Sequence, residues 1–559
     1  MKIVSKQIDW LIALLLAALS LTWHAGFLTH AHGLWRDEVN TVTVATLPSL
    51  GQLWRTLPYE SFPLLPFGVI RCWAAMVGAQ NDFGLRIFGF VVGAGILGAL
   101  WFNARVTHRT VPIWSLVLLG FNILVIRCGD SVRAYGLGMF FILLTVGLVW
   151  RAVESPSRRR LAVAALAGIL SVQTLYSNAF LLAAICGAGA LSCGLNRQWK
   201  KTGLMLGIGL PAALSLLPYL DIIHRSGLIN RPLHQAFDWQ QAWSVLSDAL
   251  GPVTAVFWLL AGAVTAVGGV CVLLFHKNLS TVEKSRGLYA LGVVVGSTVF
   301  FTIFSFVAGL RFSQWYYLSL MAVWAAGMEL MISVMIEAGR ASPRLEALPQ
   351  WRPGLFFAAV RLTGQVVMPL ALVIFLMISA RPLPLLRQSN LDWFAGKLQA
   401  SADKEDFIVV NPWYCGVGFN RYYHGPTPWQ TVPPLPDHSI HRYDLIWENM
   451  TSRPEESLRR VTDQITRVLR SNHRVWLIGQ FIRPKAGEKL AELPPATTDA
   501  GAWKNGQDIS VYYQAAWTHN LSSFLDAHSR DALQMLPPQE AANVFFERPD
   551  VFKFEGWRE

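Results

Sequence analysis

Long apolar runs with few charged residues recur through the first 380 residues, and they constrain the fold more than any other feature. Examples are Leu11 to Leu21, Phe88 to Trp101, Leu288 to Ser305 and Leu355 to Ile378. A helix needs about 20 mainly apolar residues to cross a bilayer, and several runs approach that length. The composition agrees, because only 15% of the residues are charged, against about 25% in an ordinary soluble domain. The chain is therefore predicted to be an integral membrane protein.

The apolar runs predict about eleven membrane-spanning helices, followed by a part of different composition. The predicted spans are 8–29, 83–103, 111–128, 132–150, 161–177, 179–195, 203–222, 252–275, 288–308, 315–337 and 355–379. Beyond Arg381, the apolar runs Phe407–Val410, Val475–Gly479 and Ile509–Tyr513 alternate with helix-like stretches such as Glu455–Leu469, which indicates an α/β domain. The predicted class is mainly α: a polytopic transmembrane domain at 1–380, with a first outer loop at 30–82, and a soluble α/β domain at 381–559.

The formal net charge of +12 is concentrated in the membrane part. Residues 381–559 hold 20 basic and 21 acidic residues, so 27 of the 47 basic but only 14 of the 35 acidic residues precede them. Basic residues gather in alternate loops, which the positive-inside rule assigns to the cytoplasm. This distribution argues against nucleic acid as a partner. A cytoplasmic N-terminus and an odd number of spans send the C-terminal domain to the outer face, the periplasm in a Gram-negative bacterium.

Two adjacent carboxylates, Asp37 and Glu38, follow the first predicted span on this outer side. A carboxylate in a partly buried site near the lipid can take a proton from an attacking hydroxyl. The alternative is that both are solvated loop residues, as acids after a helix often are. Spacing alone does not choose between these interpretations.

A second polar segment, Asp130 to Tyr135, lies at the outer boundary between two predicted spans. Asp130 and Arg133 are three residues apart, so in a helical turn they share a face and could offer a carboxylate and a cation to one ligand. Alternatively, Asp130 or Ser131 caps the following helix and Arg133 extends to lipid head groups. Arg36, Arg133 and Arg311 all lie on the side that the positive-inside rule depletes, and guanidinium groups bind phosphate oxygens bidentately.

The C-terminal part offers weaker signals. Its Tyr- and Trp-rich segment, Asn411 to Trp429, suits sugar stacking, although such residues more often pack or face the membrane. Cys415 is the only cysteine beyond Arg381, so neither a disulfide within that domain nor a cysteine-based zinc site is possible.

Several short motifs together resemble the GT-C membrane glycosyltransferases, in particular the branch of protein O-mannosyltransferases and lipid A aminoarabinose transferases. The motifs are Asp37-Glu38, Pro63-Leu64 after Tyr59-Glu60-Ser61-Phe62, Phe83 to Arg86, the Asp130/Arg133/Tyr135 element, and Arg311-Phe312 before an aromatic helix. Their order and predicted side agree with the family over residues 8–340. Two positions depart from it: Ser61-Phe62 stands where many relatives have His or Lys, and Asn178 where many have His.

The resemblance implies an inverting transfer of a hexosyl or pentosyl unit from a polyprenyl-phosphate donor to an envelope acceptor, a glycolipid such as lipopolysaccharide, a polysaccharide or a protein. It implies Asp37 as general base, Glu38 and Asp130 as further catalytic residues, and Arg133, Arg311 and Tyr135 as binders of the donor phosphate. Glu38 and Glu60 are the candidate ligands if a divalent cation, Mg²⁺ or Mn²⁺, takes part. The implied location is the bacterial inner membrane. The competing hypotheses are a flippase or transporter for a lipid-linked precursor and a non-catalytic assembly scaffold.

Overall fold

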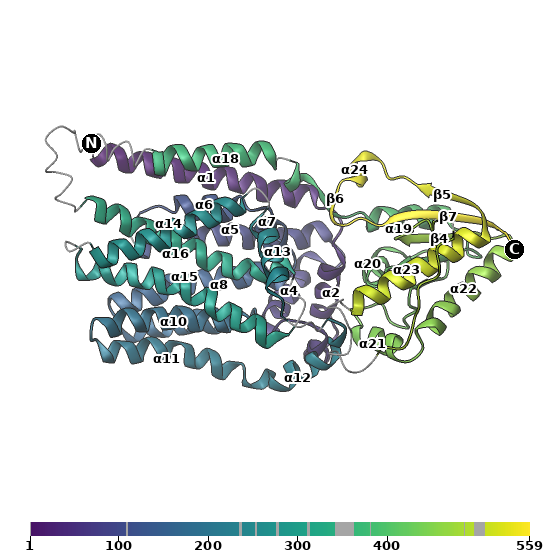
Figure 1. Cartoon of the computed structure of the whole chain (residues 1–559), viewed down its shortest axis with the longest axis horizontal. Helices are drawn as coiled ribbons and strands as arrows, with labels where there is room; N and C mark the ends of the chain where they lie inside the picture. Colours follow the sequence, from purple (N-terminus) through teal and green to yellow (C-terminus); the bar gives the residue numbers. More distant parts are fainter. Residues whose placement is uncertain are drawn as a thin grey trace.

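The computed structural model describes residues 2–107, 110–233, 237–251, 254–275, 279–309, 313–340, 363–380, 382–485, 487–496 and 509–559. Figure 1 shows a bundle of long, roughly parallel helices joined at one end to a domain that contains a β-sheet. The start of the first helix lies at the end of the bundle far from that domain (Figure 1). The predicted class, a mainly α multi-pass protein with a C-terminal α/β region, is confirmed.

Seven helical segments of the described residues are long and apolar enough to cross a membrane, or eight if a pair bent by 101° forms one span. That pair is α13 with α14. The helices of the bundle are α1 (Lys2–His30), α5 (Asp82–Thr107), α6 (Ile113–Gly120), α7 (Ile123–Gly129), α8 (Ala134–Glu154), α9 (Arg158–Val172), α10 (Asn178–Leu195), α11 (Trp199–Ser215), η2 (Leu217–Tyr219), α12 (Leu220–Ile229), η3 (Arg231–Leu233), α13 (Trp239–Leu250), α14 (Ala255–Phe275), α15 (Thr281–Ala308), η4 (Gln314–Tyr317), α16 (Leu318–Arg340), η6 (Thr363–Val367) and α18 (Met368–Ser379).

Four of the eleven predicted spans are not among these seven segments: 111–128, 161–177, 252–275, whose helix α14 belongs to the bent pair, and 355–379. The span 111–128 is broken into α6 and α7 at Asn122, whose side chain accepts hydrogen bonds from the backbone N–H groups of Leu124 and Val125 and so starts a new helix. The span 161–177 corresponds to α9, which has 15 residues. The span 355–379 lies within the described residues only from residue 363 onward.

The outer loop predicted at 30–82 folds into short helices. They are α2 (Arg36–Ala45), α3 (Leu50–Thr56), η1 (Leu57–Tyr59) and α4 (Leu64–Val77). Of these, α2 and α4 lie at the end of the bundle next to the C-terminal domain (Figure 1). Helix α2 begins where the Glu38 carboxylate accepts a hydrogen bond from the backbone N–H of Trp35 at 3.2 Å. The two acids in its first turn, Asp37 and Glu38, also favour a helix start, because the N-terminus carries partial positive charge.

The C-terminal domain is built on a five-stranded sheet of order β3-β2-β4-β7-β5. Strands β2 and β4 are buried along their whole length and pair in parallel, whereas β7 runs antiparallel to β4 and β5. A separate two-stranded sheet joins β1 and β6. The elements are η7 (Leu383–Leu385), β1 (Arg387–Ser389), α19 (Leu391–Ser401), β2 (Phe407–Asn411), α20 (Cys415–Tyr422), β3 (Trp429–Thr431), α21 (Tyr443–Thr451), α22 (Pro454–Arg470), β4 (Val475–Gly479), α23 (Ile509–His528), β5 (Ser529–Met535), α24 (Gln539–Ala542), β6 (Val544–Glu547) and β7 (Asp550–Trp557).

Buried and partly buried polar contacts fix the C-terminal domain to the helical part. Asp82 at the start of α5 accepts hydrogen bonds from Arg421 and from the Tyr422 hydroxyl, both at 2.6 Å. Arg127, the last basic residue of α7, donates to the Gln388 side chain at 2.8 Å. These contacts join the two parts of the chain, and the candidate site also lies between these parts.

Candidate active site

A cavity of about 770 Å³ lies between the outer helices and the C-terminal domain. Its charged side chains are Arg36, Asp37, Glu60, Arg133 and Asp248. Its aromatic wall consists of Tyr59, Tyr135, Trp315, Tyr316, Trp413, Tyr414 and Tyr443. Its neutral polar groups include Asn40, Ser61, Asn230, Gln241, Gln314, Gln480, Ser510 and Gln514, and His441 completes the polar set. The helical part and the C-terminal domain therefore each contribute residues to the lining of one cavity.

Asp37 is the carboxylate that the sequence analysis favoured as base, and it faces this cavity from the first turn of α2. Its Oδ2 lies 3.7 Å from the Arg133 guanidinium, and its Oδ1 lies 3.6 Å from that of Arg36. Burial alone would raise the pKa of Asp37, but Arg133, the contact with His441 and Arg36 outweigh it and hold the pKa well below its usual range. Asp37 is therefore ionised throughout the physiological pH range.

Arg133 reaches the cavity from the residue before α8 and contacts three groups of the outer loop. It donates hydrogen bonds to the backbone carbonyl of Asp37 at 2.9 Å and to the Thr41 hydroxyl at 2.7 Å, and it lies 3.8 Å from Glu60. Its guanidinium also covers the ring of Phe62 at 4.7 Å. Ser61-Phe62, one of the departures from the family motif, thus supplies an aromatic face to the cation.

Arg36 holds a similar position on the side of the C-terminal domain. Its guanidinium lies over the Tyr414 ring at 4.1 Å and 3.4 Å from Glu547, a buried residue of β6. The cation therefore lies between Asp37 and Glu547, and both carboxylates hold it in place.

Glu60 is a second acidic group of the cavity, and its state differs from that of Asp37. Burial raises its pKa to about 7, although Arg133 acts in the opposite direction. The Asn40 amide donates to Glu60 Oε1 in a short contact. At neutral pH, Glu60 therefore exists as a mixture of protonated and ionised forms.

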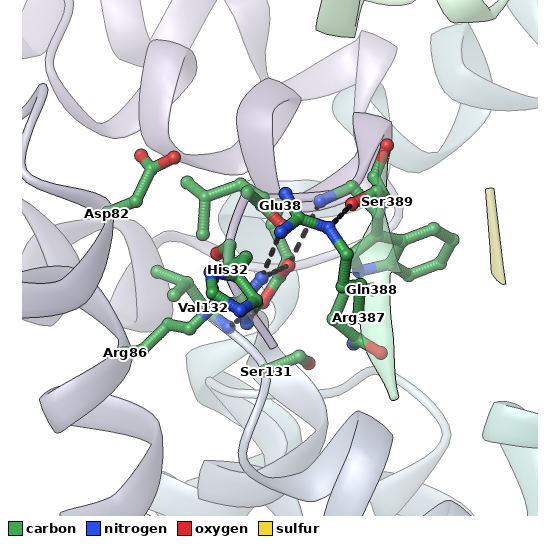
Figure 2. Close-up of polar contacts among 12 residues, drawn as sticks. His32, Glu38, Asp82, Arg86, Ser131, Val132, Arg387, Gln388 and Ser389 are labelled. Atoms are coloured by element: carbon green, nitrogen blue, oxygen red, sulfur yellow. Dashed lines mark hydrogen bonds and ion pairs between the residues drawn. The ribbon is translucent and has the colours of Figure 1, made fainter. Parts of the chain in front are cut away.

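Glu38 was expected to be catalytic or to bind a metal, but in the structure its carboxylate lies in the protein interior, away from the cavity. Its two oxygens pair with the Arg86 guanidinium, both at 3.1 Å, and one accepts from the Val132 backbone N–H at 2.9 Å (Figure 2). The side chain is fully buried and does not line the cavity. Instead, Glu38, which follows Asp37 in the chain, is bound to Val132, which precedes Arg133.

Asp130 was also expected to be catalytic, but it points into the helical body. Its carboxylate lies 2.6 Å from His24 Nδ1 of α1, and both side chains are 1% exposed. Gly93 of α5 packs so closely against it that an added Cβ would lie 2.1 Å from Asp130 Oδ1. Asp130 therefore holds the turn before α8 and does not reach the cavity.

Of the remaining expected residues, Tyr135 lines the cavity and its ring lies 5.7 Å from the Arg133 guanidinium. Arg311 lies outside the described residues. Asn178, the second departure from the family motif, is buried and donates to the Gly138 carbonyl at 3.1 Å, away from the cavity.

The expected metal ligands, Glu38 and Glu60, are not brought together, because Arg86 occupies the carboxylate of the former and Asn40 contacts the latter. In the described part of the chain, no group of three His, Cys, Asp or Glu side chains is arranged to hold a metal ion.

Sequence reasoning missed His441, which comes from the loop before α21. Its Nε2 lies 3.3 Å from Asp37 Oδ1, and its side chain is 7% exposed. Arg36 was noticed only for its charge, and Glu547 was not noticed. His441 and Glu547 are separated from Asp37 by some 400 and 500 positions and stand in no motif, so only the folded chain brings them together.

Two solved structures show what the fold is similar to. ArnT from Cupriavidus metallidurans, bound to undecaprenyl phosphate, aligns over 83% of this chain and 92% of that chain, at 10% identity and a TM-score of 0.46. The Archaeoglobus fulgidus oligosaccharyltransferase tethered with an acceptor peptide aligns over 94% and 73%, at 10% identity and a TM-score of 0.42. At these values, nothing about substrates or residue roles in this chain follows from the likeness.

No protein-family model matches the sequence, and no curated protein matches it.

Proposed function

We propose that the chain is a glycosyltransferase that moves a sugar from a polyprenyl-phosphate donor to an acceptor of the cell envelope, with inversion and with Asp37 as the base. The observation that carries this proposal is an ionised carboxylate held between two arginines, Arg36 and Arg133, in a cavity at the end of a membrane bundle. A transfer from a phosphate-linked donor needs both a base for the acceptor and cations for the departing phosphate.

The reaction is a single displacement at the anomeric carbon. The acceptor hydroxyl or amine loses its proton to Asp37 as its oxygen or nitrogen bonds to that carbon, and the bond from the carbon to the phosphate oxygen breaks. The electron pair of the broken bond leaves with the polyprenyl phosphate, whose added negative charge Arg133 and Arg36 stabilise. Because phosphate is a good leaving group, no strong general acid is needed.

The same arginines explain how a carboxylate with a depressed pKa can serve as a base. In the free protein, their charges hold the proton affinity of Asp37 low. A donor phosphate that pairs with them offsets this positive charge, so the pKa of Asp37 rises when the donor is bound. Asp37 becomes more basic at the stage when the acceptor must be deprotonated.

For the location, we propose a cytoplasmic N-terminus, a bacterial inner membrane and a periplasmic C-terminal domain. The asymmetry of basic loops supports this orientation. The start of α1 and the C-terminal domain lie at opposite ends of the bundle (Figure 1). This arrangement also supports the proposed orientation. A lipid-linked donor would then meet its acceptor at the outer surface of the membrane, where confinement in one cavity favours reaction.

A transporter of lipid-linked precursors is the alternative function. Transporters place their binding groups near the middle of the membrane, on broken helices. The charged residues that line the described cavity instead lie together at the end of the bundle, which favours the transferase.

The test uses purified protein and a strain that lacks it. A lipid extract of that strain supplies the donor, its envelope fraction supplies the acceptor, and mass spectrometry measures the product. We expect the wild-type protein and the control Asp221→Asn, an exposed carboxylate paired with Arg225, to form product. Asp37→Asn should lower the rate by at least about a hundredfold, the range of general base catalysis. Wild-type rates in Asp37→Asn would contradict the assignment of the base.

A further inference from the structure

The C-terminal domain places one side chain, that of His441, directly against the candidate base. The residue precedes α21, and its ring packs edge-on to Trp413 with the centroids 6.1 Å apart. The Tyr443 ring lies 6.0 Å from the imidazole and packs edge-on to Trp413 at 5.2 Å. These aromatic neighbours bury the imidazole and restrict its rotation, so its orientation is determined by the fold of the domain.

His441 contacts the polar network around two of the cavity acids, Asp37 and Glu60. Its Nε2 lies 3.3 Å from Asp37 Oδ1. Its backbone N–H donates to Asn40 Oδ1 at 2.7 Å, and the amide of Asn40 in turn donates to Glu60. The loop that carries His441 is therefore tied to α2 by a side chain contact and a main chain contact at once.

The protonation state of the ring follows from its surroundings. Burial lowers the pKa of His441, although the adjacent Asp37 carboxylate acts in the opposite direction, and the positive charges of Arg36 and Arg133 lower it further. The ring is therefore neutral at pH 7. A neutral imidazole with its proton on Nε2 has one N–H donor, and Nε2 lies 3.3 Å from Asp37 Oδ1.

We propose that His441 is a positioning residue of the transfer reaction, which donates from Nε2 to Asp37 Oδ1 and orients the carboxylate toward the acceptor. This inference rests on the proposed function. The proton of the acceptor passes to Asp37, and His441 keeps its own proton throughout. Asp37 Oδ1 is held by His441 and Arg36, so Oδ2 on the side of Arg133 and the donor phosphate is the oxygen that takes the proton. The C-terminal domain is thus part of the active site.

The experiment compares three variants in the product assay with lipid extract and envelope fraction. His441→Gln can keep an N–H donor near the position of Nε2, whereas His441→Phe fills the space without a donor. His438→Gln is the matched control, because His438 lies in the same loop, packs on Trp429 at 4.5 Å and does not line the cavity. If His441→Phe is not recovered folded, His441→Leu replaces it.

We expect His441→Phe to lower kcat about tenfold to a hundredfold, the cost of a misplaced catalytic group. The apparent KM for the lipid extract and the affinity for undecaprenyl phosphate should stay within about threefold of the wild-type values, and His441→Gln should recover most of the lost rate. An unchanged kcat in His441→Phe, a loss confined to KM, or a Gln variant no better than Phe would each overturn the inference. If the wild-type protein forms no product, the proposed function itself fails.

Discussion

At the residue scale, two acids that are adjacent in the sequence have different surroundings. Successive helix residues point about 100° apart, so Asp37 faces the cavity while Glu38 faces the interior. Glu38 binds Arg86 and the Val132 N–H. Because Asp37 directly precedes Glu38 and Arg133 directly follows Val132, the bridge fixes the spacing of the base and the cation.

Removing the charge of Glu38 should therefore destabilise the protein. Glu38→Gln leaves the buried Arg86 cation without its partner, and breaking a buried ion pair costs about 3–5 kcal/mol. We expect a clear fall in the thermal unfolding midpoint of the purified protein. Glu456→Gln, which breaks an exposed pair with Arg459, should leave the midpoint unchanged. An unaltered midpoint in Glu38→Gln would show that this bridge does not hold the junction together.

Glu60 predicts a pH dependence of stability. Its pKa is about 7 in the folded protein and 4.5 as a free group, so the folded state binds the proton more tightly. The resulting stabilisation is fully present below pH 4.5 and is lost as the pH rises through about 7. Glu60→Gln removes this contribution, so its melting temperature should fall less than that of the wild type between pH 5 and pH 8. Parallel melting curves for the two proteins would contradict the raised pKa.

At the scale of elements, the sequence predicted apolar helices well and their breaks poorly. A run of apolar residues indicates burial, but it does not show where a side chain such as Asn122 starts a new helix. The short apolar run Ile509–Tyr513 was set apart from the helix-like stretches, but it begins the 20-residue helix α23. Its buried residues continue as Tyr513, Trp517, Leu521 and Leu525. That spacing of four residues is helical, and it becomes visible only over a longer window.

The break at Asn122 also supports the cavity, and this can be tested. Besides capping α7, Asn122 donates to the carbonyls of Ala249 and Leu250 at the end of α13, the helix that carries the cavity residue Asp248. Asn122→Ala loses the cap and these bonds, for a cost of about 1–3 kcal/mol. We expect a lower melting temperature than in Ser157→Ala, which removes an exposed cap on α9. An equal effect of the two substitutions would argue that Asn122 has no role beyond capping.

At the scale of the whole molecule, the sequence predicted two parts and the side of the membrane on which to search. It could not predict that both parts share one cavity, because that depends on contacts such as Asp82 with Tyr422 across some 340 positions. Asp37, Arg133, Tyr135 and Glu60 were identified by resemblance and all line the cavity. His441 and Glu547 lie far along the chain in segments whose composition gives no sign of their role.

The most direct measurement of the central claim is a mass-spectrometric profile of envelope glycans and polyprenyl-phosphate sugars. It compares deletion strains that carry the wild-type protein or Asp37→Asn at equal levels in the membrane. The account predicts that the Asp37→Asn strain loses one glycan unit while the matching lipid-linked sugar accumulates. A complete glycan profile in that strain would contradict Asp37 as the base.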